Sequence, residues 1–368
     1  MKICILSMQR VNNMGSLLQS YALKKTLEWM NADVEFMDIK RIEEDFNLLG
    51  NYKQYFHGEN ELAGLKGKLS KLDRYAINRI RIRKQCDIQD EEFEKFRNET
   101  LKLQKKSERY DLCIIGSDEV FNCLSAGTWG FTSQLFGNIP NADKVITYAA
   151  SCGSTTYEEL PVAVSDRIRA AFFNVNGFSA RDVNTHDFIA RLTDKEIEDN
   201  LDPVLIYSFD EEVGKATLPK LPKRYCVIYS YYNRIHTKEE INAIKSFCKK
   251  HELTPIAVGT PQFWLKDYVV GTPFQCLKIF QNANFVITDT FHGTIFSAKY
   301  AKKFAILARE SNKNKLLDLV DKIGMKEHLM NRIDELDAKF NITKNKADFE
   351  RLIEKEQNKT WKYLQKYL

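Results

Sequence analysis

A histidine and its neighbours stand at a point in the sequence where a buried strand gives way to a helix. His292 follows the apolar run 284–288, and Thr290 and Gly293 flank it at the predicted start of the helix. Ligands bind at the carboxyl edge of an open parallel sheet, and the free N–H groups of a helix N-terminus favour an anion there. Because histidine titrates near neutral pH, His292 can donate or accept a proton. Alternatively, His292 and Thr290 only cap the helix.

An arginine and an aspartate follow two further apolar runs. Arg181 closes the run 178–181, and a guanidinium at such an edge can clamp a carboxylate or phosphate through two hydrogen bonds. An internal salt bridge explains Arg181 equally well. Asp118 comes just after the run 111–116, where it can accept a proton from a hydroxyl or cap a helix.

The loop after the first predicted strand carries Asn12, Asn13, Gly15 and Ser16. The two asparagines can hydrogen-bond sugar hydroxyls, but their spacing fits a structural Asx-turn equally well. Gly15 allows a close approach of the backbone, and Ser16 can cap the next helix. The loop lacks the G-x-G-x-x-G spacing, which disfavours a dinucleotide cofactor.

Parallel sheets are needed to bring these residues together, and the hydrophobic pattern predicts two α/β units. A strand at 2–6, a helix with apolar positions from Leu18 to Met30 and a strand at 34–39 form a right-handed β-α-β unit, which is how a doubly wound parallel sheet begins. Further strands are predicted at 111–116, 145–150, 178–181 and 204–206. After the proline-rich linker 218–223, the second unit has strands at 225–229, 255–258 and 284–288, helices near 238–250, 275–281 and 293–302, and a helical tail beyond Lys344.

The composition argues against several classes of protein. With 55 basic and 50 acidic residues among 368, the net charge is only +5, so nucleic acid is a poor default partner whereas a small anion fits. The eight cysteines form no C-x-x-C pair, and the six histidines lack zinc spacing. We therefore predict buried, reduced thiols and no metal. No run approaches the ~18 apolar residues of a membrane span, and a cytoplasmic protein is expected.

A basic segment at residues 59–85 interrupts the first α/β unit and is predicted to be an inserted pair of helices. Between Lys66 and Lys84 it has eight cations and the single acid Asp73. These cations could bind the inner face of an anionic membrane peripherally, each contributing about 1 kcal/mol. The favoured alternative is a solvated helical face, because an apolar stripe can pack on the protein's own core. The stripe consists of Leu65, Leu69, Leu72, Tyr75 and Ile80.

Six motifs occur in the order and approximate spacing typical of one family. They are NMGSLLQSYAL at 13–23, IGSDEVFN at 115–122, YAASCG at 148–153, FSARD at 178–182, DP at 202–203 and TDTFHGTIFS at 288–297. On these motifs, over residues 1 to about 330, the chain resembles the polysaccharide pyruvyl transferases. The resemblance implies an α/β fold like that of GT-B glycosyltransferases, in which two Rossmann-like domains face each other across a cleft. We expect an N-terminal domain over 1–217 on the acceptor side, with a helical insertion at about 59–100, a C-terminal domain over 223–330 on the donor side, and a helical tail over 331–368.

The resemblance also implies a reaction. Pyruvate would move from phosphoenolpyruvate, the co-substrate, to a pair of hydroxyls on a glycan or lipid-linked sugar, forming a ketal and releasing phosphate without a further cofactor. His292 is the expected proton donor and Asp118 the second catalytic residue. The residues expected at the donor site are Arg181, Thr290, His292, Gly293 and Lys315, and those at the acceptor site are Asn12, Asn13, Gly15 and Ser16.

Two positions depart from the family pattern. Phe121 stands where tryptophan is usual, and Lys315 where arginine is common. Lysine keeps the charge but loses the planar fork, which leaves the identity of the donor open. Two alternative functions remain: a glycosyltransferase of the same shape that uses a nucleotide sugar, and a non-catalytic scaffold for glycan assembly. The acceptor sugar and the oligomeric state are not determined by these patterns.

Overall fold

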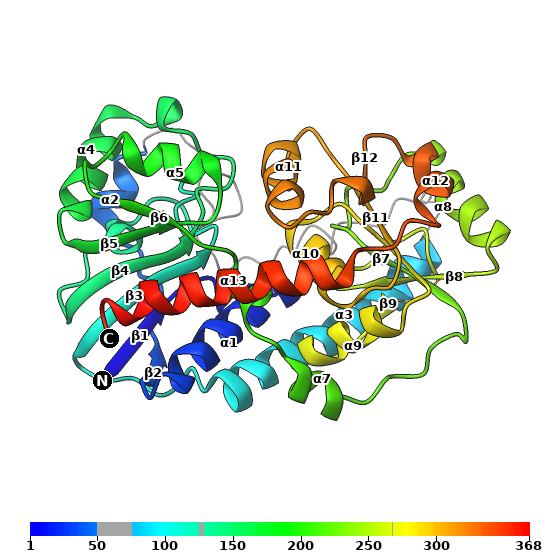
Figure 1. Ribbon diagram of the computed structural model, residues 1–368, viewed down its shortest axis with the longest axis horizontal. Helices are drawn as coiled ribbons and strands as arrows, with labels where there is room; N and C mark the ends of the chain where they lie inside the picture. The colour runs from blue at the N-terminus through cyan, green and yellow to red at the C-terminus, as the bar shows by residue number, and fades with distance from the viewer. Residues whose placement is uncertain (50–75, 125–128, 267) are drawn as a thin grey trace.

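The computed structural model describes residues 1–49, 76–124, 129–266 and 268–368, and the strands in this part of the chain form two six-stranded parallel sheets. Figure 1 shows the sheets in two halves of the molecule, side by side. The first sheet has the order β2-β1-β3-β4-β5-β6, and the second has the order β12-β11-β10-β7-β8-β9. Both orders reverse direction once, so each half is a doubly wound α/β unit. The predicted α/β fold with two Rossmann-like units is confirmed.

The first sheet is built from short apolar runs, as expected of parallel strands covered on both faces. Its strands are β1 (Lys2–Leu6), β2 (Asp33–Phe36), β3 (Tyr110–Asp118), β4 (Ala142–Ala150), β5 (Val175–Ala180) and β6 (Ile197–Asp199). The helices that connect or flank them include α1 (Met14–Trp29), α2 (Glu43–Asn47), α4 (Val162–Phe172) and α5 (Val183–Ala190). Helix α1 is buried over most of its surface because it packs on β2 and β3 of its own half and on a helix of each half.

The second sheet contains the three strands that the sequence predicts and three further short ones that it does not. The predicted strands are β7 (Tyr225–Tyr229), β8 (Thr254–Val258) and β10 (Phe285–Thr288), and the others are β9 (Tyr268–Val269), β11 (Phe304–Leu307) and β12 (Leu329–Met330). The predicted helices are present as α8 (Lys238–Lys250), α9 (Pro273–Asn282) and α10 (Phe291–Tyr300), and α11 (Lys313–Lys322) follows β11. The two-residue strands β9 and β12 give too little periodicity for a prediction from the sequence.

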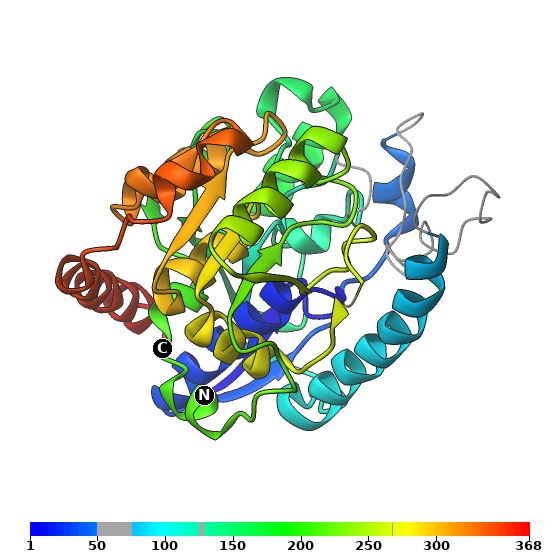
Figure 2. The same ribbon diagram turned by 90° about the vertical axis from the view of Figure 1, so that its right-hand side faces the viewer.

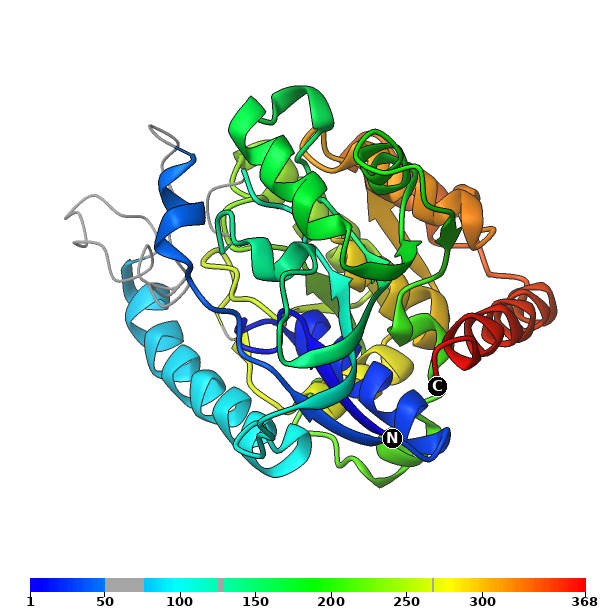
Figure 3. The same cartoon turned by 90° about the vertical axis from the view of Figure 1, so that its left-hand side faces the viewer.

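Two long helices, α3 (Ala76–Lys95) and α13 (Lys346–Gln365), join the halves. Gln89 of α3 exchanges two hydrogen bonds with the backbone of Gly271 in the second half, at 3.0 and 3.1 Å. Tyr363 of α13 donates a hydrogen bond to the carbonyl of Thr147 in β4, at 2.8 Å. Figures 2 and 3 show α3 and α13 on opposite flanks of the molecule, with the two chain ends close together. The halves are therefore tied together on both flanks.

The sequence prediction is wrong for residues 204–206, which form part of the short helix α6 (Pro203–Ile206) instead of a strand. The side chain of Asp202 accepts a hydrogen bond from the backbone N–H of Val204 at 3.0 Å, and proline suits the first position of a helix. These two local signals outweigh the apolar character of the run. The second strand is also shorter than predicted and ends at Phe36.

Much of the basic insertion predicted at 59–85 lies outside the described residues, together with four members of its apolar stripe, Leu65, Leu69, Leu72 and Tyr75. From Ala76 onward, the chain forms α3 and then a π-helical turn at Phe96–Leu101. Ile80, the remaining member of the stripe, is 57% exposed, so its predicted place in the core is wrong. Ile82 and Cys86 of the same helix pack into the core of the second half instead.

The cysteine side chains belong to the protein core. All eight cysteines are buried and carry free thiols, as predicted. Over the part of the chain that the structure describes, no helix is both long enough and apolar enough to cross a membrane.

Candidate active site

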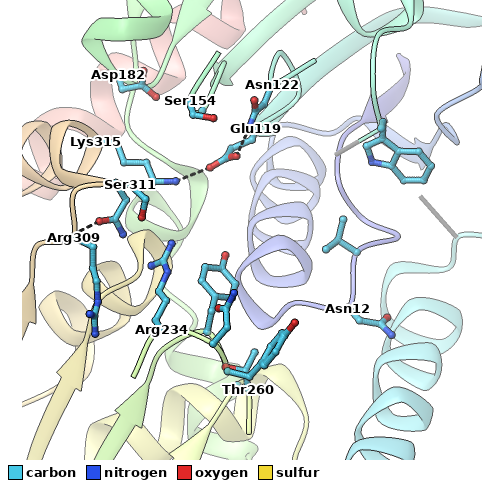
Figure 4. Close-up of a pocket in the computed structure, with 18 of the residues that line it drawn as sticks. Asn12, Glu119, Asn122, Ser154, Asp182, Arg234, Thr260, Arg309, Ser311 and Lys315 are labelled. Carbon is cyan, nitrogen blue, oxygen red and sulfur yellow. Dashed lines mark hydrogen bonds and ion pairs between the residues drawn. The ribbon is translucent and has the colours of Figure 1, made fainter. Parts of the chain in front are cut away.

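The loops that carry most of the predicted site residues meet where the strand order of each sheet reverses. This point lies between β1 and β3 in the first sheet and between β10 and β7 in the second. A cleft of about 1780 Å³ and an adjoining cavity of about 130 Å³ open there, and Glu119, Arg234 and Lys315 line both. Figure 4 shows these three side chains converging from the two halves. Ligands bind at such reversal points in open α/β sheets, so the smaller cavity is the candidate active site.

His292, in the first turn of α10, lines the smaller cavity. Thr290 caps this helix by accepting a hydrogen bond from the backbone N–H of Gly293 at 3.0 Å, so the imidazole is not needed as a cap. His292 is only 9% exposed, and its Nε2 atom lies 3.4 Å from Oδ2 of Asp202 in the other half. Among the described residues, Nε2 has no hydrogen-bond partner. An imidazole placed in this way can exchange a proton with a ligand in the cavity.

Two glycines at or beside His292 lie where a side chain would not fit. A Cβ atom at Gly15 would lie 2.2 Å from Cγ of His292, so the start of α1 packs directly on the imidazole from the other half of the molecule. A Cβ atom at Gly293 would lie 2.1 Å from Oγ1 of Thr288. The role of Gly15 in this structure is therefore a close contact with His292, whereas the sequence predicts a contact with the acceptor.

Arg181 follows β5 and reaches the same point from the first half. Its Nη1 atom donates a hydrogen bond to Oδ2 of Asp202 at 2.9 Å and lies 3.9 Å from Oδ1 of Asp118. The guanidinium lies over the ring of Phe291, 4.1 Å from its centroid. Burial acts to lower the pKa of Arg181, but Asp202 and Asp118 together raise it. The internal ion pair is thus present, while Arg181 still lines the cavity and its Nε atom lacks a partner among the described residues.

Asp202 is the carboxylate that the histidine and the arginine share, and sequence reasoning did not select it as a site residue. Its side chain is fully buried. Burial would raise the pKa of the Asp202 carboxyl, but His292 and Arg181 lower it to about 2. The motif Asp202-Pro203 was the available signal. From the sequence alone the motif gives no sign of these contacts, because the partners of Oδ2 lie far along the chain.

Asp118 lies at the end of β3, buried beside Arg181, with a backbone φ of 77°. Ser16 donates a hydrogen bond from Oγ to Oδ2 of Asp118 at 2.7 Å, and the backbone N–H of Glu119 donates to Oδ1 at 3.0 Å. A non-glycine residue in the left-handed region is uncommon, and such residues gather at functional sites. The structure brings Asp118 and Ser16 together at the cavity, where the Asp118 carboxylate can accept a further hydrogen bond.

Lys315 of α11 reaches across the cleft and pairs with Glu119 of the first half at 2.6 Å (Figure 4). Asn122 donates a second hydrogen bond to Glu119 at 2.7 Å. Burial would raise the pKa of the Glu119 carboxyl, but the charge and hydrogen bond of Lys315, helped by Arg181, lower it to about 2. Lys315, the cation predicted for the donor site, therefore lies at the cleft, where its ammonium group is bound to the carboxylate of Glu119.

Asn12 and Asn13, both predicted to bind the acceptor, use their side chains within the protein. Asn12 donates to Asp90 at 2.8 Å and accepts from Arg97 at 2.5 Å. Asn13 caps α1 by accepting from the backbone N–H of Gly15 at 2.7 Å. The Asx-turn alternative describes Asn13 correctly. Asn12 still lines the large cleft and Asn13 the smaller cavity.

Two arginines of the second half also reach the cleft and were missed from the sequence. Arg234 lies after β7 and donates to the backbone carbonyl of Asp289 at 2.6 Å. Arg309 lies after β11 and binds the Asp289 carboxylate at 2.8 Å and Glu240 at 2.6 Å. Arg309 has no clear signal in the sequence because the short strand before it was not predicted. Within the described ranges, no group of three or more His, Cys, Asp or Glu side chains is arranged to hold a metal ion.

The sequence of the chain matches one family model, and its fold is similar to those of several solved structures. The model of the family described as polysaccharide pyruvyl transferase matches residues 13–311. No curated protein matches the chain.

Among solved structures, UDP-GlcNAc 2-epimerase from Methanocaldococcus jannaschii, in complex with UDP-GlcNAc and UDP, is 10% identical, with 96% of this chain and 99% of that chain covered and a TM-score of 0.49. The heptosyltransferase WaaC of E. coli, with ADP, is 9% identical, with 88% and 98% covered and a TM-score of 0.37. The calicheamicin glycosyltransferase CalG4 is 10% identical, with 100% and 98% covered and a TM-score of 0.43.

Proposed function

Because the chain belongs to the polysaccharide pyruvyl transferase family, we propose that it transfers the pyruvyl group of phosphoenolpyruvate to two hydroxyls of a glycan or lipid-linked saccharide, with formation of a ketal and release of phosphate. The observation that carries the proposal is the convergence of His292 and Arg181, one from each half, on the carboxylate of Asp202 beside the smaller cavity. A proton donor and a fixed cation, held together at a ligand-sized cavity, suit an anionic enol substrate.

His292 supplies the proton in this proposal. The protonated imidazole, which faces Asp202 through Nε2, gives a proton to the methylene carbon of phosphoenolpyruvate, which becomes the methyl group of the product. The neighbouring carbon then carries oxocarbenium character, and the first hydroxyl of the saccharide attacks it. When phosphate leaves, the same carbon regains oxocarbenium character, and the second hydroxyl attacks it to close the ketal. Of the two hydroxyl protons, one restores His292 and the other leaves with phosphate.

Asp118 receives the proton of the attacking hydroxyl in this scheme. Its Oδ2 atom already accepts a hydrogen bond from the hydroxyl of Ser16, at 2.7 Å. A carboxylate that binds one hydroxyl in this way can accept a second one from a saccharide. The proton then passes to His292 or to phosphate, which completes the balance.

Arg181 and Lys315 hold the charged groups of the donor. Arg181 carries an unpartnered Nε atom within the described residues, and both side chains line the smaller cavity. Because Lys315 is paired with Glu119 at 2.6 Å, an incoming phosphate or carboxylate competes with Glu119 for its ammonium group. Both residues point to a donor with more than one negative charge.

Ligand-dependent thermal unfolding tests the donor without knowledge of the acceptor. A ligand that binds the native state raises the melting temperature by mass action. We expect phosphoenolpyruvate to stabilise the wild-type protein, and nucleotide sugars to have no effect at the same concentration. Stabilisation by a nucleotide sugar alone would overturn the proposal in favour of a glycosyltransferase. Stabilisation by neither class would leave the scaffold alternative.

The reaction itself is tested by phosphate release from phosphoenolpyruvate in the presence of a panel of lipid-linked and free glycans. For a productive acceptor, we expect His292→Ala to fold normally and to lose turnover by roughly 100-fold or more, the scale of general acid catalysis. His186→Ala is the matched control, because His186 is a partly exposed histidine that pairs with Asp199 on the surface. Near-normal turnover in folded His292→Ala would contradict the assignment.

A further inference from the structure

The two oxygens of Asp202 have separate partners. Oδ1 accepts a hydrogen bond from the backbone N–H of Val204 at 3.0 Å and so caps α6. Oδ2 accepts from Arg181 at 2.9 Å and from Oγ of Ser117 at 3.3 Å, and it lies 3.4 Å from Nε2 of His292. Capping alone needs only one oxygen. The second oxygen is therefore available to connect the first half of the molecule to the imidazole of the second.

No other contact in the described structure gives the buried imidazole nitrogen a charged partner as near as Asp202. Gly15 of α1, which packs directly on the ring, carries no charge. The charged residues that line the cavity with His292 are Asp118, Glu119, Arg181, Arg234 and Lys315. Most of these charges are already paired, since Lys315 binds Glu119 and Arg181 binds Asp202. Asp202 therefore decides how the ring is oriented and how well it bears a positive charge.

We propose that Asp202 is a positioning residue, which holds the Nε2 side of the His292 imidazole and stabilises the protonated ring that donates to the substrate. This inference rests on the proposed function above. A buried carboxylate that holds an imidazole and its positive charge is a general device of acid–base catalysis. Asp202 does not touch the reacting atoms in this proposal, because it does not line the cavity, and it acts through His292.

Asp202→Asn removes the charge while keeping a side chain of the same size that caps helices as well as aspartate does. With the amide oxygen toward Val204, the NH₂ group faces the N–H donors of Arg181 and His292. Because it cannot accept a hydrogen bond, the positive charges of these two side chains lose their stabilising partner. We expect kcat to fall by roughly 10-fold or more, as part of the 10²–10⁴ contributed by a positioned acid. The alkaline limb of the kcat profile should move to lower pH. The KM for phosphoenolpyruvate should not rise, because Arg181 loses its competitor for the donor anion.

Two further variants separate this role from a structural one. Asp202→Glu keeps the charge, and we expect it to restore part of the kcat and the position of the alkaline limb. Asp45→Asn is the matched control, because Asp45 is also fully buried and accepts one backbone N–H, from Ser133 at 2.7 Å, and one arginine N–H, from Arg167 at 2.8 Å. If Asp202→Asn loses activity only to the extent of Asp45→Asn, with an unchanged pH profile, the proposal is overturned.

A measurement without substrate keeps this inference apart from the proposed reaction. In ¹⁵N-histidine-labelled protein at pH 6, we expect a downfield, slowly exchanging Nε2–H proton of His292, assigned by its absence in His292→Ala. The signal should disappear in Asp202→Asn or, should that variant not fold, in Asp202→Ser, since serine also caps helices. Absence of the signal from the wild-type protein would overturn the inference. Its presence in a protein that neither binds nor consumes phosphoenolpyruvate would uphold the Asp202–His292 contact and overturn only the proposed function.

Discussion

At the scale of single residues, Arg181 is held more firmly than a surface arginine because three features act on it together. Its Nη1 atom is bonded to Asp202 at 2.9 Å, its flat face lies on Phe291, and the side chain is 3% exposed. A guanidinium can satisfy all these contacts and still present a free N–H edge to a ligand. In the proposed function, this geometry preorganises Arg181 to bind the anionic groups of the donor.

Arg181→Lys should therefore not be a conservative change. Lysine keeps the positive charge but lacks the planar fork and the flat face. We expect the KM for phosphoenolpyruvate to rise about 10-fold or more, equivalent to at least about 1.4 kcal/mol of binding free energy. Steady-state kinetics measure the KM, and the dependence of the melting temperature on phosphoenolpyruvate concentration measures the binding affinity. Arg191→Lys, a change at an exposed arginine that pairs with Glu158, serves as control. Equal donor affinity in the two variants would make Arg181 purely structural.

At the scale of secondary structure, the site depends on how α10 meets elements of the other half. Near its start, His292 packs on Gly15 of α1 and faces Asp202 at the N-terminus of α6. Toward its end, Lys299 donates to the carbonyls of Val204 at 2.7 Å and Leu205 at 3.4 Å, also in α6. Burial lowers the pKa of Lys299 to about 7. Helix α10 is thus attached to α6 near both of its ends, which fixes the direction of the imidazole.

Gly15→Ala tests this packing. Alanine is a better helix former than glycine by about 1 kcal/mol, so α1 itself should not suffer. The new methyl group would lie 2.2 Å from Cγ of His292, and the ring must move. We expect turnover to fall by about 10-fold or more with little change in secondary structure, measured by phosphate release and circular dichroism. Gly214→Ala, in α7 (Asp210–Lys215), is the matched control because a methyl group there meets nothing within 4 Å. Full activity in Gly15→Ala would show that the ring position is not critical.

At the scale of the whole molecule, contacts between the two halves assemble the cavity. The Glu119–Lys315 pair crosses the cleft itself, while α3 and α13 join the halves on their flanks. Neither half contains a complete set of site residues, since Arg181 and Asp118 come from the first and His292 and Lys315 from the second. The stability of the assembled state and the integrity of the site are therefore coupled.

The Glu119–Lys315 pair should make part of this stability dependent on pH. The pKa of Glu119 is held at about 2, below its ordinary value of about 4.3. The ionised carboxylate therefore contributes fully to the stability of the folded protein at pH values above the ordinary pKa. As pH falls from about 5 to 2, the unfolded state takes up the proton first, and this contribution is lost. We expect the excess stability of wild type over Glu119→Gln to shrink over this range.

Denaturant unfolding at pH 7, 5, 4 and 3 measures the difference between the two proteins, in which the other carboxylates cancel. Glu211→Gln provides the control, because Glu211 pairs with Lys215 on the exposed surface of α7 and an exposed pair contributes little. A constant difference between wild type and Glu119→Gln across the whole range would contradict the assigned role of the pair.

Local sequence patterns predict the α/β class, most longer strands and the position of His292, because these depend on the spacing of apolar residues and on the residue types just after each strand. The roles of the polar residues depend instead on tertiary contacts. Asn12 binds Asp90 and Arg97, which are distant in the chain, and Gly15 packs on His292 across the two halves. Asp202 was likewise identified as a positioning residue only through contacts with residues distant in the chain. Its helix cap is a local contact, although the sequence predicts a strand there, whereas its second oxygen meets Arg181 and His292 only after both sheets have folded and docked.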